Sequence, residues 1–115
     1  MTSTTLAADP SPVDFEHLKR MALGDGALER EVLEMFLKQA GPLLEAIAAR
    51  PAEAATLAHT LKGSARAIGA FFVADCATAL EDAGPEGNDR AQALAALQEQ
   101  VATARTAIEA RLGRS

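Results

Sequence analysis

Apolar residues recur every three or four positions along most of the chain, which is the spacing of one face of an α-helix. The pattern predicts a short helix after Asp14 and four longer ones, over residues 27–49, 51–68, 72–83 and from residue 88 onward. Breaks containing glycine separate these helices, the clearest being Gly84-Pro85-Glu86-Gly87, except before the third helix, where Pro51 suits the first turn. Pro42 lies inside the second helix, but the apolar phase resumes after it, so we expect a kink there rather than an end.

Short connections between successive helices favour antiparallel neighbours. We therefore expect an all-α fold, an up-down antiparallel four-helix bundle with a short extra N-terminal helix. Residues 1–12, which contain mostly Thr, Ser, Ala and Pro, are expected to form a flexible tail, and residues 13–115 a single helical domain. The composition agrees with helices, because the 115 residues include 27 Ala and only four Phe, with no Trp or Tyr.

Charge and composition narrow the partners and the compartment. The 16 acidic residues outnumber the 11 basic ones, giving a formal net charge of −5 and a pI near 4.9. Nucleic acids and anionic membranes attract basic surfaces, so neither is expected as a partner. The single cysteine, Cys76, cannot form an internal disulfide and lies on an apolar helical face, where we expect it to pack. With no signal-peptide pattern and no apolar run of about 18 residues, the chain is expected to be cytoplasmic.

His59 departs from the pattern of a plain bundle. At about 100° per residue, the apolar side of its helix is centred opposite the histidine. That side comprises Leu57, Leu61, Ala65 and Ile68. His59 is therefore expected to face solvent from the middle of a helix, and Lys62, Gly63 and Arg66 all lie within about 60° of it.

This arrangement has two interpretations. As a functional site, an exposed imidazole can act as a nucleophile near neutral pH, and Lys62 and Arg66 can attract an anionic group to it. Gly63 would let that group approach closely, which is one reason for a mid-helix glycine that costs about 1 kcal/mol relative to Ala. As a plain surface, the same residues would be a solvated helical face.

Other groups offer little chemistry. We interpret His17 as a surface residue and the Phe71-Phe72 pair as an anchor in the core. No paired carboxylates, Ser/His/Asp set or metal-ligand spacing occurs, so we expect no metal or cofactor of the protein's own. No glycine-rich nucleotide-binding loop occurs either, so autonomous kinase activity is not expected.

The segment from Ala58 to Ala70, AHTLKGSARAIGA, closely resembles the phosphorylation motif of histidine-containing phosphotransfer (HPt) domains. That motif has a His, then Lys-Gly three and four residues later, then a Gly ten residues after the His. Here these residues are His59, Lys62, Gly63 and Gly69. Many members of the family carry Gly and Asn where this chain has Arg66 and Ala67. The resemblance extends weakly over residues 13–112.

The resemblance implies a phosphorelay carrier. His59 would accept a phosphoryl group from an aspartyl phosphate on a receiver domain and pass it to another receiver, with Lys62 and Gly63 serving the phosphoryl group. We place four further residues on the partner or phosphate face: Arg66, Ala55, Thr56 and Gly69. A bound Mg²⁺ is expected on the partner receiver during transfer, and a hybrid histidine kinase is a further expected partner.

One alternative stays open for a chain with Arg66 and Ala67 in these positions. The protein could be a helical adaptor that keeps the same fold and binds receiver domains without carrying phosphate. In either case we expect a monomer, since a domain with a single nucleophile and a short set of helices can bury its apolar stripes within itself.

Overall fold

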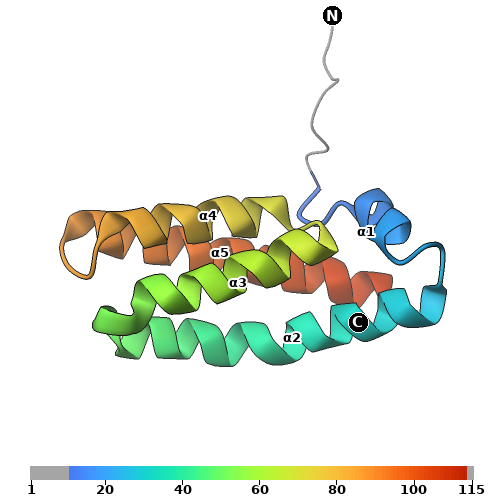
Figure 1. Cartoon of the computed structure of the whole chain (residues 1–115), viewed down its shortest axis with the longest axis horizontal. Helices are drawn as coiled ribbons and strands as arrows, with labels where there is room; N and C mark the ends of the chain where they lie inside the picture. The colour runs from blue at the N-terminus through green and yellow to red at the C-terminus, as the bar shows by residue number, and fades with distance from the viewer. Residues whose placement is uncertain (1–10, 114–115) are drawn as a thin grey trace, which may run out of the picture.

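The computed structural model describes residues 11–113, which form helices joined by short turns (Figure 1). The elements in chain order are α1 (Phe15–Met21), α2 (Gly26–Ala49), the 3-10 turn η2 (Pro51–Glu53), α3 (Ala54–Ile68), α4 (Phe71–Ala83) and α5 (Asn88–Arg111). No strand occurs among these residues. Helices α2 to α5 form the four-helix bundle, and the short α1 lies at one end of it, beside the turn between α3 and α4. The predicted all-α architecture is confirmed.

Two aspartates begin the first two helices. The Asp14 carboxylate accepts a hydrogen bond from the His17 amide at 3.1 Å, and the Asp25 carboxylate accepts two, from the amides of Ala27 and Leu28. Such caps satisfy amides that have no partner inside the helix. Pro51 opens a single 3-10 turn before α3, where its missing amide hydrogen costs nothing.

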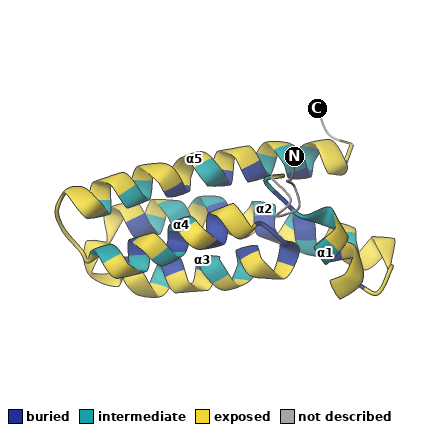
Figure 2. Ribbon diagram, turned by 90° about the horizontal axis from the view of Figure 1, so that it is seen from above, coloured by how far each residue is buried: buried dark blue, intermediate teal, exposed yellow. Residues whose placement is uncertain are grey.

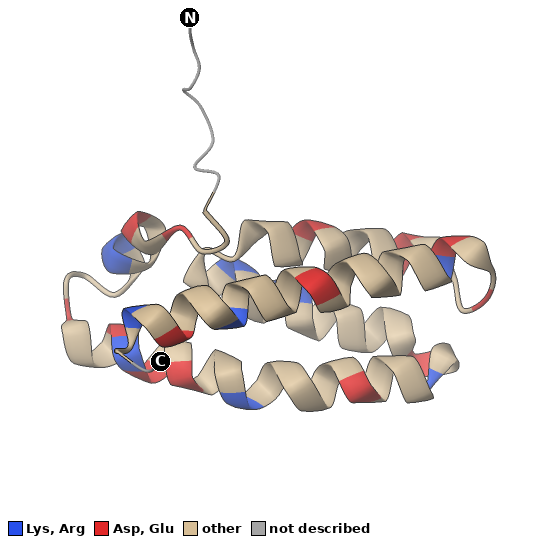
Figure 3. Cartoon of the chain, turned by 180° about the vertical axis from the view of Figure 1, so that it is seen from behind, with Lys and Arg blue, Asp and Glu red and all other residues tan. Residues whose placement is uncertain are grey.

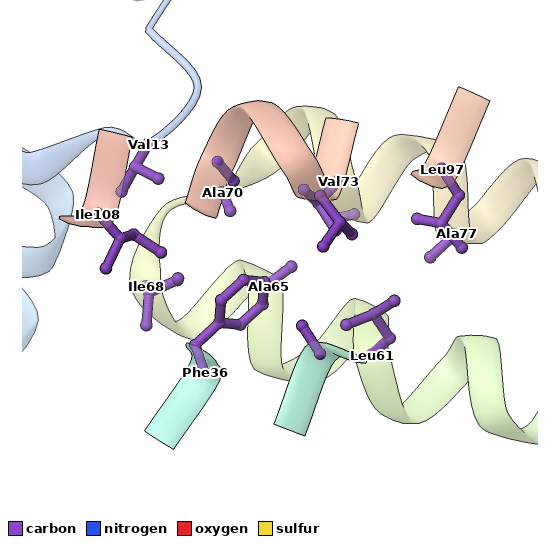
Figure 4. Close-up of a cluster of buried hydrophobic side chains, with 14 of the residues drawn as sticks. Val13, Phe36, Leu61, Ala65, Ile68, Ala70, Val73, Ala77, Leu97 and Ile108 are labelled. Atoms are coloured by element: carbon purple, nitrogen blue, oxygen red, sulfur yellow. The ribbon is translucent and has the colours of Figure 1, made fainter. Parts of the chain in front are cut away.

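Buried residues lie on the sides of the long helices that face one another (Figure 2). Their side chains are aliphatic or alanine, with Phe36 as the one buried aromatic among the described residues. Figure 4 shows the centre of this cluster, where Phe36 from α2, Leu61 and Ala65 from α3, and Val73 from α4 point toward one another. All buried side chains among the described residues are apolar. The buried side chains between α3 and α4 include several alanines, which are small, so the backbones of these two helices can pack closely.

Three arginines spaced along α5 hold it to α2. Arg90 donates to the carbonyl oxygen of Ile47 at 2.8 Å, and Arg105 donates to that of Leu37 at 3.4 Å. Arg111 pairs with the carboxylate of Glu29 at 2.8 Å. The Leu37 carbonyl is next to that of Lys38, whose usual helical donor is absent because residue 42 is proline. α2 continues through Pro42, and Arg105 supports it at this point.

The turn between α3 and α4 is built on Gly69. Its φ is +86°, in the left-handed region that favours glycine, and its carbonyl accepts a hydrogen bond from the amide of Asp14 at 2.9 Å. A Cβ on Gly69 would lie 2.6 Å from the Asp14 carbonyl oxygen. The segment before α1 is therefore fixed against the C-terminal end of α3.

Some positions differ from the sequence-based predictions. Phe71 and Phe72 do not anchor the core, because they are 40% and 41% exposed at the start of α4, where Phe71 packs edge-on against the ring of His17. Leu28 and Met35 are also exposed although they follow the apolar spacing of α2. The apolar side of α2 is therefore wider than the part of its surface that the other helices cover. The predicted tail falls almost wholly on residues 1–10, outside the described residues.

Acidic and basic residues are mixed along α1, α2 and α5, whereas the charged residues of α3 are both basic and those of α4 are all acidic (Figure 3). Within residues 11–113 no single helix carries a continuous basic stripe of the kind that binds nucleic acid. None of the helices in this part of the chain is long and apolar enough to cross a membrane.

Candidate functional site

His59 lies in the middle of α3 with 69% of its side chain exposed, as the helical spacing predicts. Ala55 and Thr56, one turn before it, are exposed too. Together with His59 and Glu81 they line a shallow hollow of about 290 Å³. The structure thus brings Ala55 and Thr56 to the side of the imidazole.

Glu81 on α4 connects the histidine to the lysine of the motif. One of its carboxylate oxygens lies 3.1 Å from Nδ1 of His59, and the other lies 2.6 Å from Nζ of Lys62. The side chains of Lys62 and Glu81 are 16% and 21% exposed, so this ion pair is largely shielded by its neighbours. The site therefore has three members, two from α3 and one from α4.

The charge of Glu81 determines which ring nitrogen of His59 is available. The ion pair with Lys62 is the largest influence that lowers the pKa of Glu81, and the contact with His59 lowers it further against the opposing effect of burial. The carboxylate is therefore ionised at neutral pH and can only accept hydrogen bonds. A neutral His59 ring must donate its Nδ1 hydrogen to it, which leaves the lone pair on Nε2.

Gly63 and Arg66 lie on the same side of α3 as His59. A Cβ on Gly63 would meet no atom within 4 Å, so this part of the helix surface is open. Arg66 is exposed one turn further along. On the α2 side, a second hollow of about 200 Å³ is lined mainly by apolar side chains, among them Met35 and Ala67.

Gly69 does not lie with these residues. It is buried against Asp14 at the end of α3, ten residues and about 15 Å of helix from His59. The left-handed turn and the close approach of Asp14 both require glycine at this position, so the fold alone accounts for it.

Sequence reasoning missed the role of Glu81, although a signal for it exists. His59 lies eleven residues before Ala70 (70 − 59) and Glu81 eleven after it (81 − 70), and Ala70 stands at the turn between α3 and α4. In an antiparallel helical hairpin, residues equally far from the turn lie at the same level. Counting outward from the two-residue turn brings His59 level with residues 80 and 81, and of these Glu81 is the one that can pair with an imidazole.

The remaining candidates carry less chemistry. Cys76 is half-buried, and burial is the main reason that its pKa is raised. The reactive thiolate form is therefore less populated at neutral pH. In the part of the chain that the structure describes, no group of three or more His, Cys, Asp or Glu side chains could hold a metal ion.

The site is thus an exposed imidazole whose second nitrogen is held by a carboxylate, on a helical hairpin within a four-helix bundle. The sequence matches the model of the Hpt domain family over residues 31–111. The chain therefore belongs to the Hpt domain family and is of the class of phosphorelay carriers.

A solved structure is similar over nearly the whole chain. It is that of the histidine phosphotransferase ShpA from Caulobacter crescentus, with a TM-score of 0.73 and 29% sequence identity. The match covers 90% of this chain and 92% of that one. A search of curated protein sequences finds no match to this chain.

Proposed function

We propose that Nε2 of His59 accepts a phosphoryl group from the aspartyl phosphate of a receiver domain and later passes it to the aspartate of another receiver. The observation that carries this proposal is the exposed imidazole whose Nδ1 is occupied by Glu81. It supports Nε2 as the one ring nitrogen open to an incoming phosphorus atom.

The proposed transfer needs no general base, because the attacking Nε2 atom carries a lone pair and no hydrogen. The Nε2 lone pair forms the new N–P bond while the P–O bond of the aspartyl phosphate breaks, and the receiver's aspartate leaves as a carboxylate. The ring gains positive charge as the bond forms, and its Nδ1 hydrogen stays directed at Glu81. The negative carboxylate at 3.1 Å stabilises that charge. Return of the group to a second receiver is the same step in reverse.

Phosphoryl transfer requires mainly in-line positioning and charge stabilisation, so a small helical domain can serve as one half of the site. We propose that the receiver supplies the other half, including the Mg²⁺ on its own aspartate side, and that a hybrid histidine kinase stands upstream. The shallow hollow beside His59 and the open surface at Gly63 leave room for such a docked domain.

The proposal is tested by incubating the protein with a panel of phosphorylated receiver domains and following acid-labile, base-stable label. The wild type is expected to take up label, and the His59→Gln variant none. The matched control is His17→Gln, which removes the other histidine of the chain and is expected to be labelled like the wild type.

Label on His59→Gln would contradict the assignment. A receiver that binds the wild type in stoichiometric amounts, in the presence of Mg²⁺, and transfers nothing to it would favour the alternative function of a helical adaptor.

A further inference from the structure

The two cations beside His59 are in different electrostatic states. Nζ of Lys62 lies 2.6 Å from Glu81, and its side chain is 16% exposed. Its charge is already matched by a carboxylate. Arg66 is exposed, and among residues 11–113 its guanidinium has no ion pair or hydrogen-bond partner. Arg66 is therefore the cation on this face with its charge and its donors uncommitted.

The helix directs Arg66 toward the reacting ring. Arg66 comes seven positions after His59, which is about two helical turns. The two residues therefore lie on nearly the same line of the helix, about 10.5 Å apart along its axis. Helical side chains lean toward the N-terminus and cover the turn that precedes them. The turn that precedes Arg66 contains Gly63, where no side chain stands and nothing occupies the space of a Cβ. The surface between His59 and Arg66 is thus clear.

We infer that Arg66 binds the phosphoryl group while it passes between His59 and the receiver. This inference rests on the proposed function. In an in-line transfer the attacking and leaving atoms lie on one axis, and the three remaining oxygens, which carry the charge, point sideways from it. With the axis rising from His59, those oxygens extend over the open surface at Gly63. A planar guanidinium can donate two hydrogen bonds to them, whereas the ammonium of Lys62 is held by Glu81.

The inference gives Lys62 and Arg66 separate tasks. Lys62 holds the Glu81 carboxylate in place, and so acts on the Nδ1 side of the ring. Arg66 acts on the group being transferred. Removing Arg66 is then expected to slow the chemical step without disturbing the fold or the contact between His59 and Glu81.

The test is single-turnover transfer from a phosphorylated receiver at increasing receiver concentration, for the wild type and for Arg66→Ala and Arg66→Lys. We expect the limiting rate constant of Arg66→Ala to fall at least about 10- to 100-fold, since the loss of even one of the two hydrogen bonds to a charged group has an effect of that size. Arg66→Lys should recover part of the loss, because it restores the charge and not the planar donor pair. Arg20→Ala on α1 makes the same change in net charge away from the site and is expected to match the wild type.

Three outcomes would overturn the inference. If Arg66→Ala and Arg20→Ala transfer at the same limiting rate, Arg66 takes no part in the step. If Arg66→Ala changes only the receiver concentration needed for half-maximal rate, Arg66 is a docking contact and not a ligand of the phosphoryl group. If the wild type itself takes no label from any receiver, the proposed function fails and this inference fails with it, a result that no Arg66 variant could produce.

Discussion

Gly63 and Gly69 belong to one motif and one helix, yet the structure uses them in opposite ways. A Cβ on Gly63 would meet nothing within 4 Å, in a stretch of regular helix. A Cβ on Gly69 would lie 2.6 Å from the carbonyl oxygen of Asp14, in a left-handed turn. The middle of α3 thus keeps free space beside His59, whereas its end is closed against the start of the domain. Gly63 leaves open surface beside His59, and Gly69 is required by the fold.

The largest effect is expected from changing the glycine at the closed end. Gly69→Ala combines left-handed backbone strain with a clash against backbone atoms that cannot rotate away, so we expect a loss of about 3 kcal/mol in the free energy of unfolding. Denaturant unfolding measures this. The matched control is Gly24→Ala, at a φ of +77° with no atom within 4 Å, where strain alone should cost about 1 kcal/mol. Equal losses for the two variants would show that the contact with Asp14 contributes nothing.

Substitution of Gly63 by alanine should change the stability in the opposite direction to substitution of Gly69. Gly63→Ala is expected to stabilise the protein by about 1 kcal/mol, because alanine is the better helix former and meets no obstacle. Gly63→Leu should also remain folded but slow phosphoryl transfer, since its side chain fills the space beside His59. Thermal unfolding and the transfer assay separate the two effects. Wild-type transfer by Gly63→Leu would mean that the open space is not needed.

The smallest effect on stability is expected at Glu81. Its pKa is lowered in the folded protein, chiefly by Lys62, so its contribution is present above the ordinary value of 4.5 and is lost as the pH falls through the lower folded-state value. The wild type should therefore be more stable than Glu81→Gln above about pH 4.5, by less than about 1 kcal/mol because the pair keeps some contact with solvent. This difference should disappear at lower pH.

Glu81→Gln also tests the orientation of the ring. Glutamine can donate or accept, so it does not require a hydrogen on Nδ1 of His59. Nitrogen chemical shifts of His59 should show one dominant tautomer in the wild type and a mixture in the variant. A mixture in both proteins would contradict the role given to Glu81.

Much of the fold could be predicted from local signals in the sequence. Asp14, Asp25 and Pro51 stand at helix starts, and Gly69 at a helix end, for reasons that depend only on nearby backbone groups. The exposure of His59 followed from the position of the apolar stripe on its own helix. These features need no knowledge of how the helices pack.

What depended on packing was harder to predict. Met35 follows the apolar spacing of α2, but that spacing cannot show how far neighbouring helices extend, and the residue is 49% exposed. The pairing of His59 with Glu81 depends on the register between α3 and α4, which neither helix encodes alone. Gly69 was placed with His59 because the motif includes both, whereas its neighbour Asp14 is 55 residues away in the sequence (69 − 14).

The contacts between α5 and α2 make the two helices differ in how well they tolerate side-chain substitutions. Arg90 and Arg105 bond to main-chain carbonyls of α2, which every residue possesses. The acceptors at positions 37 and 47 would survive a change of side chain, provided that the helix persists. The donors would not, because only a long side chain that carries an N–H donor, such as Arg or Lys, could reach these carbonyls. Substitutions at positions 37 and 47 of α2 therefore preserve these contacts, whereas substitutions at Arg90 and Arg105 of α5 tend to remove them.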